Sequence, residues 1–196
     1  MKPDGNNPWL IRRLRDGKTL YDKVTLETQD LIMRPLRLRD AKDFHHYAKD
    51  PEVARYVLWD PHANLAQTRA VLLGLIAQSR QEQLFTRALV LKDSGRMIGT
   101  IGLVWRDWES HAAEVGFSMA KDCWGRGLMT QALTQYLCFV FTRLGIHRVE
   151  VRDMVSFYAF LSRSPKGKTT IRLCNAVVER MNGADDSASR PCSSTR

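Results

Sequence analysis

The feature that most constrains this chain is a strand-like segment that runs through two glycines into a long amphipathic helix. Residues 113–120 have strand character, and Gly125 and Gly127 follow them. After Met129, apolar residues recur at every third or fourth position, and Gly145 stands where such a helix would end. Glycines at this junction let a ligand approach the backbone, and the first helical N–H groups can bind phosphate. A bare Gly-x-Gly also occurs in ordinary turns, so by itself it is weak evidence.

Hydrophobic periodicity predicts the remaining elements. A helix should open at Asp40 as N-cap, with Asp43 in its first turn, and end at Pro51. Pro35 indicates an edge or irregular position in the first strand. Strands are expected at 31–38, 84–92, 97–105, 112–120 and 146–151, and a second helix at 65–81. Three consecutive strands with tight turns predict an antiparallel meander.

The length and composition suit one globular domain. The chain has 196 residues, of which 44% are hydrophobic, enough for a sizeable core. We find no apolar run as long as a membrane span and no secretory signal in residues 1–20. We therefore expect a cytoplasmic protein that does not act at a membrane.

The net charge of +9 raises the question of nucleic-acid binding. Residues 24–151 hold sixteen Lys and Arg against fourteen Asp and Glu, so the excess lies in the flanking segments. A nucleic-acid-binding face should instead carry a basic stripe on a folded element. We therefore expect no nucleic-acid partner.

The cysteines Cys123, Cys138, Cys174 and Cys192 contain no C-x-x-C pair and no metal-ligand spacing with histidine. Cys138 falls on the apolar face of the long helix, and a structural role is favoured for Cys123 over a reactive one. We expect neither a disulfide framework nor a metal site.

Three segments resemble a known family. Glu114–Met119 and Trp124–Ala132 resemble motif A of the GNAT N-acetyltransferase superfamily, closest to the branch of RimJ and RimL. Asp50-Pro-Glu-Val53 resembles a turn of the same branch. The resemblance implies an α/β (α+β) fold with a mixed, mostly antiparallel sheet flanked by helices.

The resemblance covers about residues 25–151 and suggests three parts. Residues 1–24 are expected to be a flexible or docking segment, and 25–151 the acetyltransferase domain. Residues 152–196 depart from the family pattern, and whether the usual last strands are present is left open. We expect this end to be divergent and partly disordered.

The resemblance implies acetyl-CoA as cosubstrate. Its pantetheine arm would pair with the backbone of Phe117 and Met119. Its pyrophosphate would meet the loop and the first helical turn, formed by Trp124, Gly125, Arg126, Gly127, Leu128, Met129 and Thr130. Arg126 either adds charge to this site or points to solvent.

Two residues are the candidates for proton transfer. The resemblance implies Glu114 as general base, and the alternative is a structural carboxylate paired with an arginine. Tyr158 lies near the family's general acid position, and the alternative for it is a core tyrosine.

The function implied is acetyl transfer to a primary amine, with a protein or peptide N-terminus favoured. The alternatives are a small-molecule amine and a non-catalytic acyl-CoA-binding domain. We expect a monomer or a weak homodimer.

Overall fold

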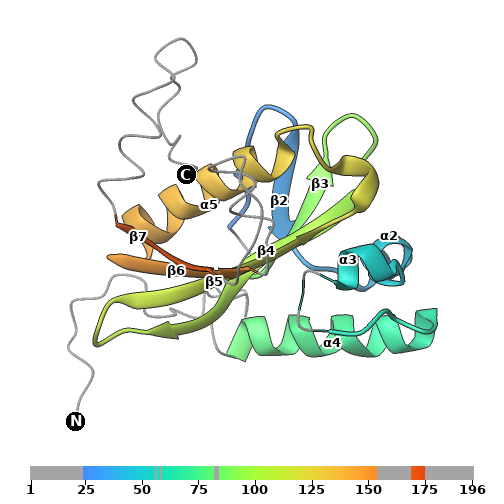
Figure 1. Cartoon of the computed structure of the whole chain (residues 1–196), viewed down its shortest axis with the longest axis horizontal. Coiled ribbons are helices and arrows are strands. Elements are labelled where there is room, and N and C mark those ends of the chain that lie inside the picture. The colour runs from blue at the N-terminus through green and yellow to red at the C-terminus, as the bar shows by residue number, and fades with distance from the viewer. Residues whose placement is uncertain (1–23, 56, 58, 82–83, 154–168, 175–196) are drawn as a thin grey trace, which may run out of the picture.

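The computed structural model describes residues 24–55, 57, 59–81, 84–153 and 169–174. These residues form a seven-stranded sheet in the order β1-β2-β3-β4-β5-β6-β7, with helices on both faces (Figure 1). The strands are β1 (Leu26–Glu27), β2 (Leu31–Pro35), β3 (Arg87–Leu91), β4 (Met97–Asp107), β5 (Ala112–Met119), β6 (Arg148–Asp153) and β7 (Thr169–Cys174). The helices are α2 (Ala41–Ala48), α3 (Pro51–Ala54), α4 (Leu65–Gln81) and α5 (Leu128–Arg143), with 3-10 turns η1 (Leu38–Asp40) and η2 (Lys121–Cys123).

One pair of neighbouring strands differs from all others in the described sheet. β5 and β6 are parallel, whereas every other pair is antiparallel. A parallel pair needs a crossover connection, and α5 supplies it. The pairing of β5 with β6 ends at Val115↔Val151, although β5 continues to Met119 beside β4. The two strands therefore separate over the second half of β5.

The helices divide between the two faces of the sheet. α5 lies on one face, and α2, α3 and α4 lie on the other (Figure 1). Tyr136 of α5 is fully buried, and its hydroxyl donates to the carbonyls of Leu84 and Phe85 at 3.4 and 3.2 Å. Phe85 also packs edge-on against Phe139, with ring centroids 5.4 Å apart. These contacts fix α5, and hence the loop before it, against the sheet.

Most of the sequence-based elements are present. The mixed, mostly antiparallel sheet flanked by helices is confirmed, as are α4 at its predicted bounds and Gly145 in a left-handed conformation (φ +67°) after α5. The first strand ends at Pro35 and not at Leu38, because Leu38 enters η1. Pro35 pairs with Arg87 of β3 but lies beyond the residues of β2 that pair with β1, so this end of β2 is an edge on that side, one of the two positions expected for Pro35.

The region after β6 contains a strand that the sequence analysis did not predict. β7 lies within 152–196 and pairs antiparallel with β6 from Arg148↔Cys174 to Asp153↔Thr169. The sheet therefore does not end at β6. Residues 154–168 and 175–196 lie outside the described part, and the three-part division of the chain stays a prediction.

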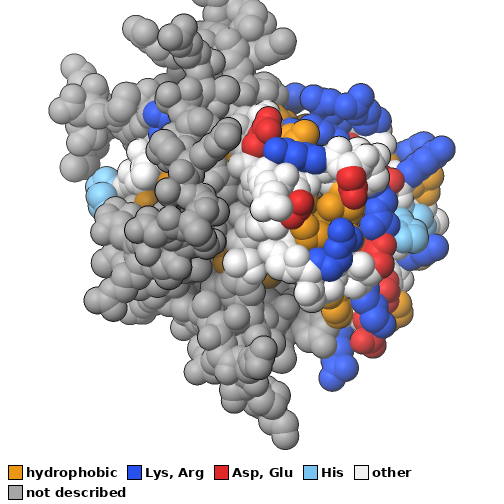
Figure 2. Space-filling model, turned by 90° about the horizontal axis from the view of Figure 1, so that it is seen from above, with side chains coloured by type: hydrophobic (Ala, Val, Ile, Leu, Met, Phe, Trp, Pro, Cys, Tyr) orange, Lys and Arg blue, Asp and Glu red, His pale blue; other side chains and the backbone are white. Residues whose placement is uncertain are grey.

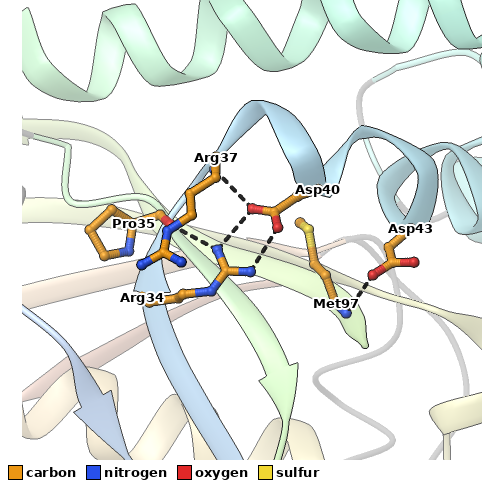
Figure 3. Close-up of polar contacts among 6 residues, drawn as sticks. All are labelled: Arg34, Pro35, Arg37, Asp40, Asp43 and Met97. Carbon is orange, nitrogen blue, oxygen red and sulfur yellow. Dashed lines mark hydrogen bonds and ion pairs between the residues drawn. The ribbon is translucent and has the colours of Figure 1, made fainter. Parts of the chain in front are cut away.

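Asp40 plays a different role from the one expected. It stands at the N-cap position of α2, but its side chain makes no cap hydrogen bond to that helix. Its carboxylate accepts from the two terminal guanidinium nitrogens of Arg34, Nη1 and Nη2, at 2.8 and 2.7 Å, and from the backbone N–H of Arg37 at 2.8 Å (Figure 3). Asp43, in the first turn as predicted, accepts the N–H of Met97 at 3.0 Å. These bonds tie the start of α2 to β2 and β4.

Candidate functional site

The two glycines between β5 and α5 both have left-handed backbone conformations. φ is +73° at Gly125 and +71° at Gly127, where a residue with a Cβ would be strained. Gly127 is the N-cap of α5, and its carbonyl accepts the N–H of Gln131 at 3.1 Å. The N–H groups of residues 128–130 precede that first intrahelical bond and have no acceptor within the helix. They form a set of donors at the positive end of a 16-residue helix.

The loop also turns back onto the end of β5. The indole Nε1 of Trp124 donates to the carbonyl of Met119 at 2.9 Å. The N–H of Ala120 donates to the carbonyl of Ile98 on β4. Because backbone groups alternate along an antiparallel strand, those of Phe117 and Met119 are directed away from β4. They face the side from which β6 diverges.

The remaining loop residues differ in what they offer. Arg126 is exposed, which agrees with both interpretations of its role. The side chain of Leu128 is buried in the core, so only its backbone can serve a ligand. Met129 and Thr130 are half-buried. Trp124, although it donates to Met119, keeps 40% of its surface exposed.

A guanidinium from the β3–β4 turn holds the start of the loop. Arg96 pairs with Asp122 at 2.7 Å, and its Nη2 lies 3.4 Å from the Sγ of Cys123. The hydrogen bond to Arg96 lowers the pKa of Asp122 and likewise raises the pKa of Arg96. Burial raises the pKa of the Cys123 thiol, which fits the structural role favoured for it.

A second set of bonds holds the first turn of α5. The Oε1 of Gln131 accepts from the hydroxyl of Thr28 at 3.0 Å and from the N–H of Asp30 at 3.3 Å. The Nε2 of Gln131 donates to Oδ2 of Asp30 at 2.7 Å. The turn between β1 and β2 is thus joined to the helix start. Both sets were missed by the sequence analysis, because their partners lie far apart in the chain.

Glu114 lies where β5 and β6 begin to separate. It is half-buried, with Trp105 opposite it on β4 and Glu150 opposite it on β6. Side chains at directly opposite positions share a face of the sheet, so two carboxylates are neighbours here. Trp105 is 49% exposed and lies beside a register shift in β4. Tyr158 lies outside the described residues, and its role stays a sequence-based prediction.

This arrangement can bind an elongated anionic ligand. The N–H donors of residues 128–130 suit phosphate oxygens, and the diverging edge of β5 suits an extended chain with amide groups. Glu114 lies earlier on the same strand, toward its N-terminal end and away from the loop. Among the described residues no group of three or more His, Cys, Asp or Glu could hold a metal ion.

A family model described as "Acetyltransferase (GNAT) domain" matches residues 30–153, which is more than half of the chain. This match spans β5, the glycine loop and α5. The chain belongs to the GNAT acetyltransferase family. The match confirms the family that we predicted for this acetyltransferase from Glu114–Met119 and Trp124–Ala132.

Individual relatives agree with this assignment. The acetyltransferase is 27% identical over 159 residues to "Uncharacterized N-acetyltransferase p20" of Bacillus licheniformis, covering 81% of this chain and 84% of the relative. It resembles the structure of a putative ribosomal-protein-serine acetyltransferase from Vibrio cholerae, with TM-score 0.66, 14% identity, and coverage of 78% and 98%.

Two further structures share the fold. The ribosomal L7/L12 α-N-protein acetyltransferase RimL has TM-score 0.59 and 17% identity, with coverage of 71% and 76%. The microcin C7 self-immunity acetyltransferase MccE, in complex with acetyl-CoA and AMP, has TM-score 0.59 and 13% identity, with coverage of 69% and 76%. At these identities the likeness concerns the fold.

A second family model, "Thioredoxin-like [2Fe-2S] ferredoxin", matches residues 128–195. A [2Fe-2S] cluster is held by four cysteine thiolates, whereas this stretch contains three cysteines, Cys138, Cys174 and Cys192. Cys138 lies within α5, the crossover helix of the acetyltransferase sheet. The residues present therefore do not fit a cluster of this kind.

The helix lengths and the surface charges bear on other kinds of partner. None of the helices in the described part is long and apolar enough to span a bilayer. On the face shown in Figure 2, Lys and Arg side chains of the described residues are interspersed with Asp and Glu. This mixed charge agrees with the near-neutral balance of residues 24–151.

Proposed function

We propose that this acetyltransferase transfers the acetyl group of acetyl-CoA to a primary amine, and that the amine is a protein or peptide N-terminus. The observation that carries the proposal is the early end of β5–β6 pairing at Val115↔Val151, directly ahead of the loop at Gly127. This early end of the pairing leaves the edge of the second half of β5 close to the N-terminus of α5, so that one ligand can bind to the strand edge and to the helix N–H groups.

The proposed cofactor pose follows the backbone. The pyrophosphate of acetyl-CoA accepts hydrogen bonds from the N–H groups of residues 128–130. The pantetheine amides pair with the backbone groups of Phe117 and Met119 that face away from β4. The carbonyl of Met119 already accepts the Trp124 indole, so the N–H of Met119 is the group offered to the ligand. The acetyl-CoA complex of MccE, which shares this fold, supports the choice of cofactor.

The reaction requires a neutral amine next to the thioester. In our proposal Glu114 accepts a proton from the substrate ammonium through a water molecule. The neutral amine nitrogen attacks the acetyl carbonyl carbon, and it loses one further proton as the carbon–sulfur bond breaks and the amide forms. Coenzyme A leaves as a thiolate that takes up a proton, so the products are the amide and the free thiol. A backbone N–H of β5 stabilises the oxyanion that forms in between. Tyr158 is the sequence-based candidate for the proton donor.

The class of acceptor is the finer part of the proposal. The names of RimL and of the Vibrio cholerae protein refer to ribosomal proteins as substrates, which favours a polypeptide N-terminus. The two alternatives that the sequence leaves open, a small-molecule amine and non-catalytic binding of acyl-CoA, give different outcomes in the experiment below.

The test measures coenzyme A release with peptides that have free N-termini and, separately, with amino acids and polyamines. We expect turnover with peptides, and a loss of about 100-fold or more in kcat for Glu114→Gln. Glu109→Gln, which changes an exposed glutamate in the β4–β5 turn, should keep wild-type activity. Turnover of small amines alone would contradict the acceptor class. Binding of acetyl-CoA without turnover of any amine would favour the non-catalytic alternative.

A further inference from the structure

We infer that Gln131 is a positioning residue for the anion-binding loop, acting through the turn between β1 and β2. This inference rests on the proposed function, because it concerns the same acetyl-CoA site. We call the side chains of Thr28, Asp30 and Gln131, with the backbone N–H of Asp30, the helix-start clasp. Its bonds join positions 101 and 103 residues apart in the sequence.

The clasp uses both ends of the Gln131 amide. Its oxygen accepts two hydrogen bonds, from Thr28 Oγ1 and from the N–H of Asp30, and its nitrogen donates to the Asp30 carboxylate at 2.7 Å. A carboxamide can make such a set because it carries an acceptor and donors on one plane. The bond to the carboxylate is charge-assisted and therefore stronger than a neutral one.

The partner turn is itself held in place. The N–H of Leu31 donates to Thr28 Oγ1 at 3.0 Å, and the N–H of Thr28 donates to the carbonyl of Leu31 at 2.9 Å. The carbonyl of Asp30 accepts the N–H of Lys92 at 2.9 Å. The clasp thus fastens α5 to a turn that belongs to the sheet.

The same residue closes the first turn of the helix. The backbone N–H of Gln131 donates to Gly127, and the three N–H groups proposed to bind pyrophosphate lie between these two residues. Gly127 has no side chain that could cap the helix. The Gln131 side chain therefore adds a polar link between this turn and the sheet, beside the buried side chain of Leu128 and the Trp124–Met119 bond. We infer that this link helps to set the direction of the N–H groups relative to β5.

The chemistry explains why an amide suits this position. A glutamate at 131 would place a second carboxylate against that of Asp30, and like charges at hydrogen-bond distance repel. Exchanging the two functional groups, with Asn at 30 and Glu at 131, would restore a donor and an acceptor with the same total charge. The clasp can therefore be tested by swapping the two functional groups in the double variant Asp30→Asn/Gln131→Glu.

The experiment compares acetyl-CoA affinity by calorimetry in Gln131→Glu, in Asp30→Asn/Gln131→Glu and in Gln29→Glu. Gln29 is exposed in the same turn, so Gln29→Glu adds an equal charge near the loop and leaves the clasp intact. We expect Gln131→Glu to weaken binding about tenfold, which corresponds to about 1.4 kcal/mol. We expect the exchanged pair to recover most of this loss, and Gln29→Glu to stay close to wild type.

A second readout does not depend on the cofactor. Amide hydrogen exchange of residues 132–134, whose N–H groups bond back to residues 128–130 within α5, should be faster in Gln131→Glu than in wild type. It should be slow again in Asp30→Asn/Gln131→Glu, with the melting temperature little changed. Equal weakening by Gln131→Glu and Gln29→Glu, or exchange rates that do not change, would overturn the inference. A wild-type protein that fails to bind acetyl-CoA would overturn the proposed function instead. The amide hydrogen exchange rates would still test the clasp in that case.

Discussion

The indole of Trp124 donates a hydrogen bond to the carbonyl of Met119 at 2.9 Å. This bond joins the glycine loop to the last residue of β5. It therefore links the two parts of the proposed cofactor site, the phosphate-binding turn and the strand edge. Since Trp124 is 40% exposed, its contribution to the core is smaller than that of a fully buried aromatic residue.

We expect Trp124→Phe to weaken acetyl-CoA binding by about threefold to tenfold, because a neutral hydrogen bond contributes about 0.5–1.5 kcal/mol. Calorimetry measures the affinity, and a thermal melt should show only a small change in stability. Trp105→Phe, at a tryptophan with 49% exposure on β4, serves as the matched control for stability. An unchanged affinity in Trp124→Phe would show that the loop keeps its position without this bond.

The ion pair between Arg34 and Asp40 should matter more for stability than the exposed pairs. Asp40 is 4% exposed and Arg34 12%, whereas the Lys92–Glu27 pair is 36% and 62% exposed. Removing one partner of a buried pair leaves the other charge uncompensated, which costs about 3–5 kcal/mol. We expect urea unfolding of Asp40→Ala to show a loss near that range, and Glu27→Ala a loss of about 1 kcal/mol or less. Equal losses in the two variants would contradict this ranking.

His62 should make folding sensitive to mild acid. Burial lowers its pKa below 6.5, and the charge of His45 lowers it further. The Nδ1 atoms of His62 and His45 both lie within 3.0 Å of the Thr68 hydroxyl. Because the unfolded chain binds this proton more readily than the folded chain, the free energy of unfolding should fall as the pH drops below about 6.5 and level off below the folded-state pKa.

The measurement for His62 is urea unfolding at several pH values. His62→Gln should reduce the pH dependence between pH 7 and 5, whereas His46→Gln, at an exposed histidine of the same helix as His45, should leave it unchanged. A pH dependence that is the same in His62→Gln and in wild type would show that another group titrates.

The parts of the fold that the sequence could predict are those with a repeated pattern. α4 and α5 are long, and β3, β4 and β5 are separated by short polar turns, so their periodicity was sufficient. β1 has only two residues, too few to show a period. β7, Thr169–Cys174, alternates weakly and lies in a segment with no family pattern to support it.

The candidate site was predictable where it depends on local sequence. Gly125 and Gly127 indicated a loop in which a ligand could approach the backbone. Both have positive φ in the structure, which glycine adopts without strain. Contacts between residues far apart in the chain have no comparable pattern in the sequence. Nothing near Gln131 in the sequence indicates Asp30 as its partner, and the Arg34 guanidinium that takes Asp40 away from capping is recognisable only once β2 and α2 are in place.

In our proposal acetyl-CoA binds with its pyrophosphate at Gly127, and calorimetry with Gly127→Glu tests this pose. Gly145→Glu is the matched control, since Gly145 also has a positive φ (+67°), a Cβ there would also meet none of the described atoms within 4 Å, and it lies past the opposite end of α5. We predict that Gly127→Glu loses detectable binding, because its carboxylate would lie where the pyrophosphate belongs, while Gly145→Glu binds like wild type. Retained affinity in a folded Gly127→Glu protein would contradict a pyrophosphate site at Gly127.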